Sequence, residues 1–201
     1  MNIICIILKK IIGIWITKKN IINDLKKELL NCSNYIVSEY LEQLEYSNKI
    51  YSNSVNTIRV IVINNGNGNC SIPMAVHRFG TNRSGIVDNA SSGGIFANID
   101  IKTGILEEAY SYYSKDFYEK HPDTGIQIKG VKIPNWNMIK ENLLKIATKF
   151  PYINFVAWDI VPTKEGFSVI EGNTSTGFGL LQGKHGIAKS ELAEFYKKFG
   201  I

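Results

Sequence analysis

The sequence contains few cysteines, few prolines and no long uninterrupted apolar run. Its 201 residues include three cysteines and five prolines. Cys5, Cys32 and Cys70 are odd in number and lack the paired spacing of a metal site, so we expect reduced thiols in a cytoplasmic protein. The first sixteen residues are largely apolar, but Lys9 and Lys10 interrupt them and no small-residue cleavage site follows. Neither a signal peptide nor a membrane span is therefore expected.

The charge balance is also weak. The net charge is +5, from 23 basic and 18 acidic residues, and the lysines are scattered along the chain. Such a balance suits a nucleotide or another small anion, and no nucleic-acid partner is expected from it. No Gly-x-x-x-x-Gly-Lys motif and no ordered Ser/His/Asp set occurs. With 44% hydrophobic residues, the chain can form one core or one large piece of a multi-part fold.

Short apolar runs separated by turn-forming residues predict an α+β fold. Strands are expected at 35–41, 57–63, 72–78, 94–100 and 105–112, and an Asn/Gly run at 64–69 joins the second to the third. Helices are expected from Asn20 to about Leu29, from Pro134 to Phe150 and from Ser190 to about Phe199. The helix after Pro134 carries the apolar stripe Trp136, Ile139, Leu143, Ile146 and Phe150. The pattern predicts a mostly antiparallel sheet with the helices packed to one side.

A second hairpin, with strands around 157–160 and 170–173, concentrates acidic and amide side chains. If its turn is a three-residue loop with Gly166 in the left-handed region, Asp159 lies opposite Glu171, and Asn173 shares their face. Opposed carboxylates with Cβ atoms about 5 Å apart repel each other, and a divalent cation removes that repulsion. Three oxygen ligands with room for water and phosphate suit magnesium.

The alternative is a solvent-facing hairpin edge on which the charges are simply solvated. Four apolar neighbours argue against that alternative and predict a largely buried strand pair: Trp158, Ile160, Val169 and Ile170. The hairpin is therefore predicted to be a metal site.

Two arginines lie on the strands that flank the Asn/Gly run. If these strands pair around the run, Arg59 can lie across from Arg78. Like charges in that arrangement need an anion between or beside them, and guanidinium groups bind phosphate or carboxylate with paired hydrogen bonds. The alternative is two surface arginines in a different register.

Two loop segments could also contact a ligand. Asp88-Asn89 precedes Gly93-Gly94, whose backbone N–H groups can cradle an anion. A flexible surface loop explains the same composition. The segment His121-Pro122-Asp123-Thr124-Gly125 could hold a substrate or form an ordinary Pro-Asp turn.

In this order, the motifs resemble the second half of an ATP-grasp domain, and most closely the sugar-transfer associated ATP-grasp family, which is related to glutamate-adding ligases. The likeness covers about residues 20–180. Thr57-x-Arg59 and Ala75-x-x-Arg78 look like the two arginine positions of the family, and Asp88-Asn89 with Gly93-Gly94 is similar to its Asn-then-Gly-Gly loop. Asp159 followed by Glu171-x-Asn173 resembles its closing metal-ligand motif.

The resemblance implies an enzyme that uses ATP and Mg²⁺ to activate a small carboxylate as an acyl phosphate, which an amine or similar nucleophile then attacks. A role in cell-surface polysaccharide biosynthesis is implied by the family name alone. Arg59 and Arg78 would stabilise the transferred phosphoryl group, and Asp159, Glu171 and Asn173 would hold the metal.

Nucleotide-binding positions are also implied by the resemblance. The segment Ser38-Glu39-Tyr40-Leu41 is similar to the family hinge, whose backbone reads adenine. Glu39, Tyr40, Leu41 and Asn89 are therefore the expected nucleotide-binding positions.

The likeness predicts one incomplete ATP-grasp domain over residues 1–201. Residues 1–50 would be a remnant of the nucleotide-binding lobe and hinge, and 51–201 the C-terminal catalytic subdomain. Relatives carry a glycine-rich loop and phosphate-binding lysines further upstream, and Gln-His where this chain has Gln43-Leu44.

Two alternatives follow. The first is a truncated, non-catalytic nucleotide- or metal-binding fragment that needs the missing lobe or a partner chain. The second is a structural domain in which the acidic set and the arginine pair coincide by chance.

Overall fold

The computed structural model describes residues 4–8, 14–16, 35–39, 41–66, 68–177, 179–183 and 186–199. The chain forms two compact units, residues 1–42 and residues 43–201. The first unit holds an antiparallel sheet in the order β2-β1-β3, made of β1 (Ile4–Leu8), β2 (Ile14–Ile16) and β3 (Tyr35–Glu39). The helix expected after Asn20 lies outside the described residues.

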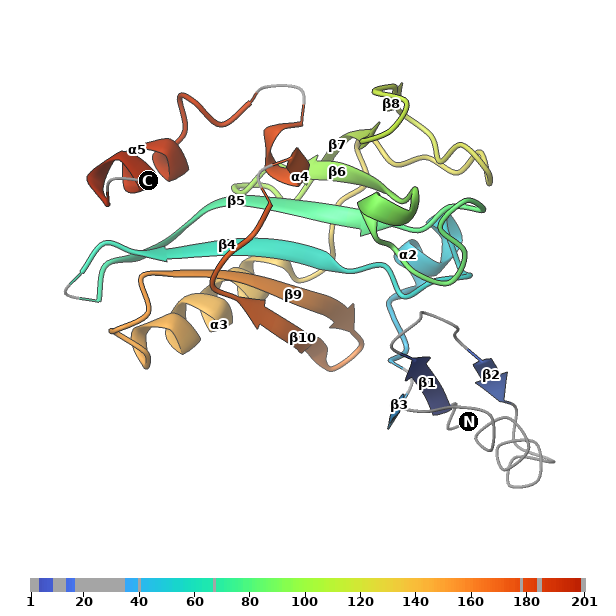
Figure 1. Ribbon diagram of the computed structural model, residues 1–201, viewed down its shortest axis with the longest axis horizontal. Coiled ribbons are helices and arrows are strands. Elements are labelled where there is room, and N and C mark those ends of the chain that lie inside the picture. The colour runs from blue at the N-terminus through green and yellow to red at the C-terminus, as the bar shows by residue number, and fades with distance from the viewer. Residues whose placement is uncertain are drawn as a thin grey trace. The chain divides into compact units, whose positions relative to one another are not determined.

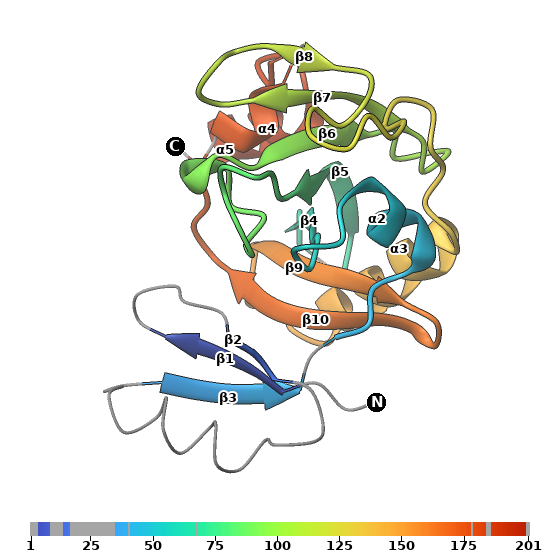
Figure 2. The ribbon, with the colours of Figure 1, turned by 90° about the vertical axis from the view of Figure 1, so that its right-hand side faces the viewer.

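A seven-stranded antiparallel sheet forms the centre of the second unit (Figure 1). Its order is β10-β9-β4-β5-β6-β7-β8, so β10 and β8 are the edges (Figure 2). The strands are β4 (Ile58–Asn64), β5 (Cys70–Phe79), β6 (Ile95–Ile99), β7 (Leu106–Ser111), β8 (Phe117–Tyr118), β9 (Phe155–Thr163) and β10 (Gly166–Asn173). The α+β class and the antiparallel sheet are confirmed.

Helices cover both faces of this sheet, so the expectation that they pack to one side is wrong (Figure 1). The helical segments are α2 (Glu45–Ile50), the 3-10 turn η1 (Ala90–Ser92), α3 (Trp136–Thr148), α4 (Gly179–Gln182) and α5 (Glu191–Lys198). Consecutive side chains of a strand point to opposite faces of the sheet, and β4 contributes to both cores in this way. Val60 belongs to the core under α3, and Ile61 belongs to the core under α4 and α5. None of the helices in the described part of the chain is long and apolar enough to cross a bilayer.

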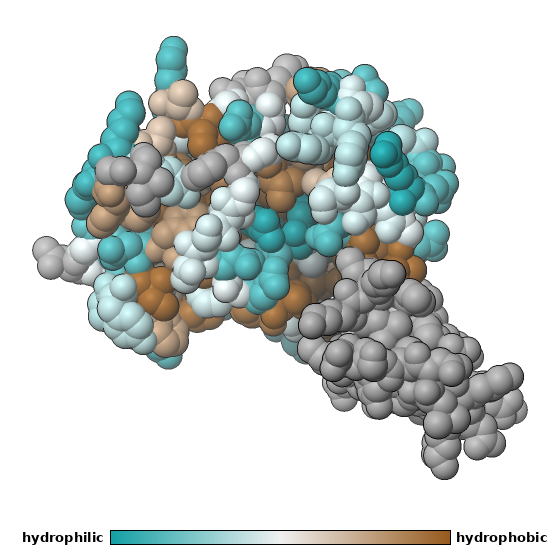
Figure 3. Space-filling model, in the orientation of Figure 1, coloured by the Kyte–Doolittle hydropathy of each residue, from teal (hydrophilic) through white to brown (hydrophobic). Residues whose placement is uncertain are grey.

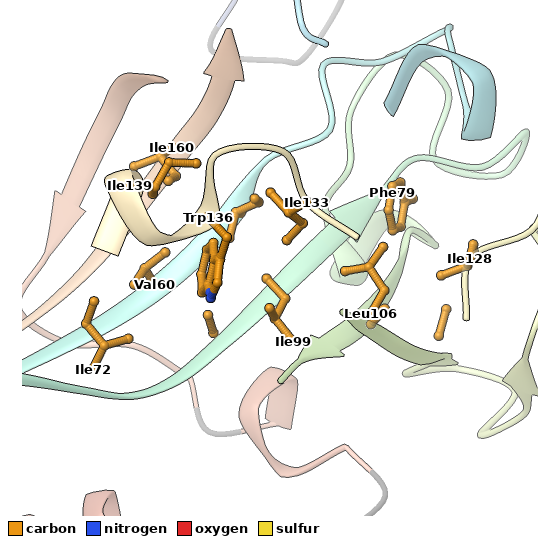
Figure 4. Packing of buried hydrophobic residues seen from close by; sticks show 14 of the residues in the cluster. Val60, Ile72, Phe79, Ile99, Leu106, Ile128, Ile133, Trp136, Ile139 and Ile160 are labelled. Carbon is orange, nitrogen blue, oxygen red and sulfur yellow. The ribbon is translucent and has the colours of Figure 1, made fainter. Parts of the chain in front are cut away.

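The larger core lies between α3 and the sheet (Figure 4). Trp136, Ile139 and Leu143 are buried as their helical spacing predicts, and the indole Nε1 of Trp136 donates to the carbonyl of Ile101 at 2.9 Å. Phe150 lies beyond the end of α3 and is 40% exposed, so it does not extend the buried stripe.

The last helix begins as the sequence predicts. The hydroxyl of Ser190 accepts a hydrogen bond from the Ala193 N–H at 3.3 Å, which caps α5. Glu191 lies in the first turn and Lys198 in the last, where each charge favours the helix dipole.

The β4–β5 register differs from the expected one. Arg59 lies opposite Val76, and the Arg78 N–H donates to the Thr57 carbonyl at 2.8 Å, so Arg78 lies across from Thr57. A bulge between Ile61 and Ile63 shifts the pairing along the two strands. The expectation that the two arginines lie directly opposite each other is therefore wrong, although as diagonal neighbours they share a face.

The β9–β10 hairpin has the expected pairing by a different route. Asp159 does lie opposite Glu171. However, Thr163 pairs with Gly166, so the turn has two residues and not three. A bulge between Val169 and Glu171 adds one residue to β10, and this extra residue brings Glu171 opposite Asp159. The three-residue turn was wrong while the register was right.

The outer strand of this hairpin is not buried. Val169 and Ile170 are 43% and 50% exposed, because β10 is an edge strand. The prediction of a largely buried strand pair is therefore wrong for β10, whereas Asp159 on β9 is only 2% exposed.

Candidate functional site

Charged side chains gather on the sheet face opposite α3, at the centre of β4, β5 and β9. Figure 3 shows hydrophilic residues collected near the middle of the second unit, with apolar residues on either side. Asp159 lies opposite Arg59 on β4 and opposite Glu171 on β10. The side chains of five predicted site residues thus share one face: Arg59, Arg78, Asp159, Glu171 and Asn173.

The Asp159 carboxylate is held by two guanidinium groups. Arg59 Nε donates to Oδ1 at 2.7 Å and Arg59 Nη2 to Oδ2 at 2.8 Å, while Arg78 Nη2 donates to Oδ2 at 2.9 Å. Burial alone would raise the pKa of Asp159, but the Arg59 hydrogen bond and the charges of Arg78 and Arg59 outweigh it and keep that pKa below its usual value. The carboxylate is therefore ionised at neutral pH.

The sequence predicts repulsion within a pair of carboxylates and within a pair of arginines, and in the structure the two pairs neutralise each other. The repulsion expected between Asp159 and Glu171 is offset by Arg59, whose Nη2 is also 3.9 Å from Glu171 Oε1. The anion expected beside Arg59 and Arg78 is Asp159 itself. Repulsion between the carboxylates consequently does not by itself require a metal ion.

Arg78 is anchored on its other side by Thr57. The Arg78 Nε donates to Thr57 Oγ1 at 2.8 Å, and its Nη2 donates to the same oxygen. Asp88 Oδ2 accepts from the Thr57 N–H at 2.7 Å and from the Thr57 hydroxyl at 2.6 Å, and lies 3.4 Å from Arg78 Nε. Thr57, Arg78 and Asp88 are all buried, so this chain of contacts is shielded from solvent.

Arg59 has one further partner in a distant segment. Its Nη1 donates to the hydroxyl of Thr176 at 3.2 Å. Thr176 lies in the segment that leaves β10 and leads to α4 (Figure 1). This contact ties that segment to the charged face.

The glycine pair after Asn89 does not present free N–H groups. Gly93 N donates to the Ala90 carbonyl at 3.1 Å and Gly94 N to the Asn89 carbonyl at 2.9 Å. A Cβ on Gly94 would lie 2.6 Å from the Asp88 carbonyl oxygen, so the close approach is to the protein's own backbone. The anion-cradle interpretation is therefore wrong, and Asn89 adjoins the site through its neighbour Asp88.

The two described histidines have structural partners. His77 Nδ1 donates to the Arg78 carbonyl at 3.2 Å, Tyr46 donates to its Nε2 at 2.9 Å, and burial lowers the pKa of His77 to about 3. His121 Nε2 donates to the Gly80 carbonyl at 2.7 Å, and burial lowers its pKa as well. Asp123 accepts from the Asn82 N–H at 2.8 Å, so the His121–Gly125 segment ties two loops together.

The nucleotide-hinge residues lie at the end of the first unit. Glu39 is the last residue of β3, and Leu41 is half-buried. Tyr40 lies outside the described residues. Their roles stay predictions.

A pocket of about 380 Å³ lies beside the charged cluster, and Phe96, which pairs with Arg78 across β5 and β6, is part of its wall. Its other lining residues come from β6, from β7 and the residue before it, from β8, from the loop at 129–130 and from the end of α4: Asn98, Ile105, Leu106, Glu107, Glu108, Tyr110, Phe117, Lys129, Gly130 and Gly183. Its volume suits a small organic molecule.

The hairpin carries oxygen donors of the kind that a hard cation binds. Glu171 is exposed, and its Oε1 accepts from the Asn173 amide at 3.0 Å, so an exposed carboxylate and an amide lie together. Each carboxylate oxygen can accept about two bonds, and Asp159 Oδ1 accepts one from Arg59 among the described contacts. No cluster of three His, Cys, Asp or Glu side chains suitable for a metal occurs in the described part of the chain.

The sequence motifs contain Thr57 and Asp88 but assign neither a contact to the arginines, and Thr176 belongs to none of these motifs. Thr57 shares a face with Arg59 because it lies two residues earlier on the same chain, so period-two alternation could have indicated that its side chain faces the arginines. Asp88 is 31 residues from Thr57, and Thr176 is 117 residues from Arg59, and no local pattern encodes either contact.

The family model described as sugar-transfer associated ATP-grasp matches residues 18–195. No curated protein matches the chain.

Proposed function

The chain belongs to the sugar-transfer associated ATP-grasp family, and on that premise we propose that it activates a small carboxylate with ATP and Mg²⁺ for attack by an amine or similar nucleophile. Family membership indicates an ATP-dependent, ligase-type function. The observation that carries the more specific proposal is the Arg59–Asp159–Arg78 cluster, with Glu171 and Asn173 beside it. A cytoplasmic location, where ATP is abundant, agrees with this role.

Burial of this cluster favours a ligand-binding role over a stabilising one. Buried ion pairs seldom stabilise a fold more than apolar side chains of the same volume would. Arg78 and Asp159 are 6% and 2% exposed, so their desolvation is substantial. A phosphate-binding role explains why these charges lie here, since guanidinium groups suit the paired oxygens of a phosphoryl group.

The charge balance predicts that metal and nucleotide bind together. Arg59 and Arg78 offset two of the three carboxylates Asp88, Asp159 and Glu171, so Mg²⁺ alone would leave one uncompensated positive charge. Nucleotide phosphates supply the compensating charge. Glu171, Asn173 and the remaining position on Asp159 Oδ1 would hold the ion, which when bound neutralises phosphate charge during transfer.

The proposed reaction has two steps. A carboxylate oxygen of the substrate attacks the γ-phosphorus of ATP, the bond to the bridging oxygen breaks and ADP leaves. An amine then attacks the acyl carbon, phosphate leaves, and the amine nitrogen loses a proton to give an amide. Arg59 and Arg78 would stabilise the charge on the transferred phosphoryl group. The pocket bounded by Phe96 offers room for the carboxylate substrate. A role in polysaccharide biosynthesis is a further proposal that rests on the family name.

Calorimetric titration with ATP, with and without magnesium, tests the binding step. We expect tighter binding with magnesium present, no binding of magnesium alone at low millimolar concentration, and loss of the magnesium effect in Asp159→Asn and Glu171→Gln. Absence of ATP binding under both conditions would refute the proposal, and full metal-dependent binding by both variants would refute the ligand set. Release of ADP with candidate carboxylates then distinguishes a ligase from a fragment that binds without turnover.

A further inference from the structure

We propose that Thr57 and Asp88 are positioning residues that orient Arg78, so that Arg78 Nη1 makes the direct contact to phosphate while Arg59 acts mainly through Asp159. This inference rests on the proposed function for the identity of the anion. The orientation itself rests on the hydrogen bonds around Arg78 and can be tested without ATP.

The donors of Arg78 are unevenly used. A guanidinium group has five N–H donors. Nε donates to Thr57, and Nη2 donates to both Thr57 and Asp159, which commits one whole edge of the group. Nη1 donates to no residue in the described part of the chain. Both of its N–H groups are therefore available to a ligand.

The donors of Arg59 are used differently. Nε and Nη2 bind the two oxygens of Asp159, and Nη1 donates to Thr176. Each of its three nitrogens thus already has a partner within the protein. Arg59 is consequently better suited to holding Asp159 and the 176 segment than to binding an incoming phosphate.

The hydroxyl of Thr57 links Asp88 to Arg78. A hydroxyl donates one hydrogen and accepts on its oxygen. The single hydrogen is directed to Asp88 Oδ2 at 2.6 Å, which leaves the oxygen lone pairs for Arg78. Asp88 therefore fixes the direction in which Thr57 accepts. Because Asp88 also accepts from the Thr57 N–H, it is itself held in place.

Removing the Thr57 hydroxyl should rotate the Arg78 guanidinium group toward another acceptor. Asp88 Oδ2 already lies 3.4 Å from Arg78 Nε. In Thr57→Val that carboxylate would be the remaining acceptor for Nε, and the guanidinium group would rotate toward Asp88. This rotation would break the Nη2 contact to Asp159 and turn Nη1 away from its native direction. Serine keeps the hydroxyl, so Thr57→Ser should retain the native orientation.

The experiment combines an NMR signal with ATP affinity. The Nε–Hε resonance of Arg78, assigned by its absence in Arg78→Lys, reports the hydrogen bond to Thr57. We expect Thr57→Val to shift or broaden this resonance and to weaken binding of ATP with magnesium about tenfold or more, as loss of a hydrogen bond to a charged group does. Thr57→Ser should restore both. Thr148→Val is the matched control, because Thr148 is exposed on α3 and should leave both unchanged.

The outcomes separate the two proposals. Unchanged resonance and unchanged affinity in Thr57→Val would refute the positioning role and leave the proposed function intact. A shifted resonance with unchanged ATP affinity would refute direct contact by Arg78. If the wild-type chain binds no ATP, the proposed function and the phosphate contact both fail, while the resonance still tests the orientation. If Thr57→Val does not fold, Asp88→Asn replaces it, with the same expected shift and weakening.

Discussion

The two faces of the seven-stranded sheet are built from neighbouring residues of the same strands but by different chemistry. On β4, Val60 packs into the core under α3 while Arg59 lies on the opposite face. On β9, Ile160 and Asp159 divide in the same way. The α3 face is stabilised by apolar burial, whereas the centre of the other face buries charges that must be paired with one another. On the proposed function, the α3 face maintains the fold and the charged face binds the ligand.

The largest expected effect is from removing the central carboxylate. Asp159→Ala leaves Arg59 and Arg78 without their shared partner, and breaking a buried pair in this way costs about 3–5 kcal/mol of unfolding free energy. Urea unfolding measures this loss. We also expect binding of ATP with magnesium to disappear. A change below about 0.5 kcal/mol, the range of ordinary surface substitutions, would show that the cluster is not a buried paired network.

A core substitution should affect stability alone. Leu143 is fully buried under α3, and Leu143→Ala removes its packing at a cost of about 3 kcal/mol. At a temperature where the variant is folded, its affinity for ATP with magnesium should equal that of the wild type. A parallel loss of affinity would mean that the two faces are not functionally separate.

Lowering the pH should reduce the free energy of unfolding in two separate ranges, one set by the buried histidines and one by Asp159. His77 has a pKa of about 3 in the folded protein against 6.5 in the unfolded chain, so the unfolded chain binds the extra proton between these values. Stability should fall by about 1.4 kcal/mol per pH unit per histidine as pH decreases through this range. His121, whose pKa is also lowered, adds to the slope.

Asp159 contributes at lower pH. Its folded pKa lies below the ordinary 3.8, so its stabilisation is complete above that value and is lost as pH falls through the folded pKa.

Urea unfolding of His77→Gln between pH 6.5 and 4 tests the contribution of His77. The free energy of unfolding should fall less steeply with decreasing pH in this variant than in the wild type. An unchanged slope would contradict the assignment to His77.

The smallest expected effect on stability is at the exposed edge of the charged face. The side chain of Glu171 is 55% exposed, so Glu171→Gln should change the unfolding free energy by no more than about 0.5 kcal/mol. Affinity for ATP should nevertheless lose its dependence on magnesium, as calorimetry would show. Glu165→Gln, in the exposed turn of the same hairpin, is the matched control and should retain that dependence.

The sequence predicted the fold class and the set of residues on the charged face better than it predicted their pairing. Period-two alternation placed Asp159, Glu171 and Asn173 together, and the structure agrees. It could not locate the bulges beside Ile61 and Val169, because a bulge depends on contacts across strands and not on local composition. In the first hairpin Arg59 pairs with Val76, two residues from the expected partner Arg78, and the bulge accounts for a shift of only one residue. The bulge in the second compensated for a wrong turn length.

Long-range contacts explain the rest of what was missed. The sequence indicates that Arg59 and Arg78 need an anion and that Asp159 needs a cation. It predicts a bound phosphate or carboxylate for the first and a metal ion for the second, whereas in the structure these side chains pair with one another. Only the sheet order, which places β9 beside β4, shows that these groups neutralise one another. The sequence leaves a ligand cradle and a surface loop both open for the glycine pair, because composition cannot distinguish close approach to a ligand from close approach to Asp88.

The shift in thermal unfolding midpoint caused by ATP with magnesium tests the central claim most directly. A ligand at one hundred times its Kd stabilises the folded state by about 2.7 kcal/mol. We predict that the midpoint rises for the wild type and equally for Lys145→Met, which removes one positive charge from the exposed surface of α3. Arg78→Met, which removes one positive charge from the opposite face, should show no rise. An equal rise in Arg78→Met would contradict the assignment of the charged face as the nucleotide phosphate site.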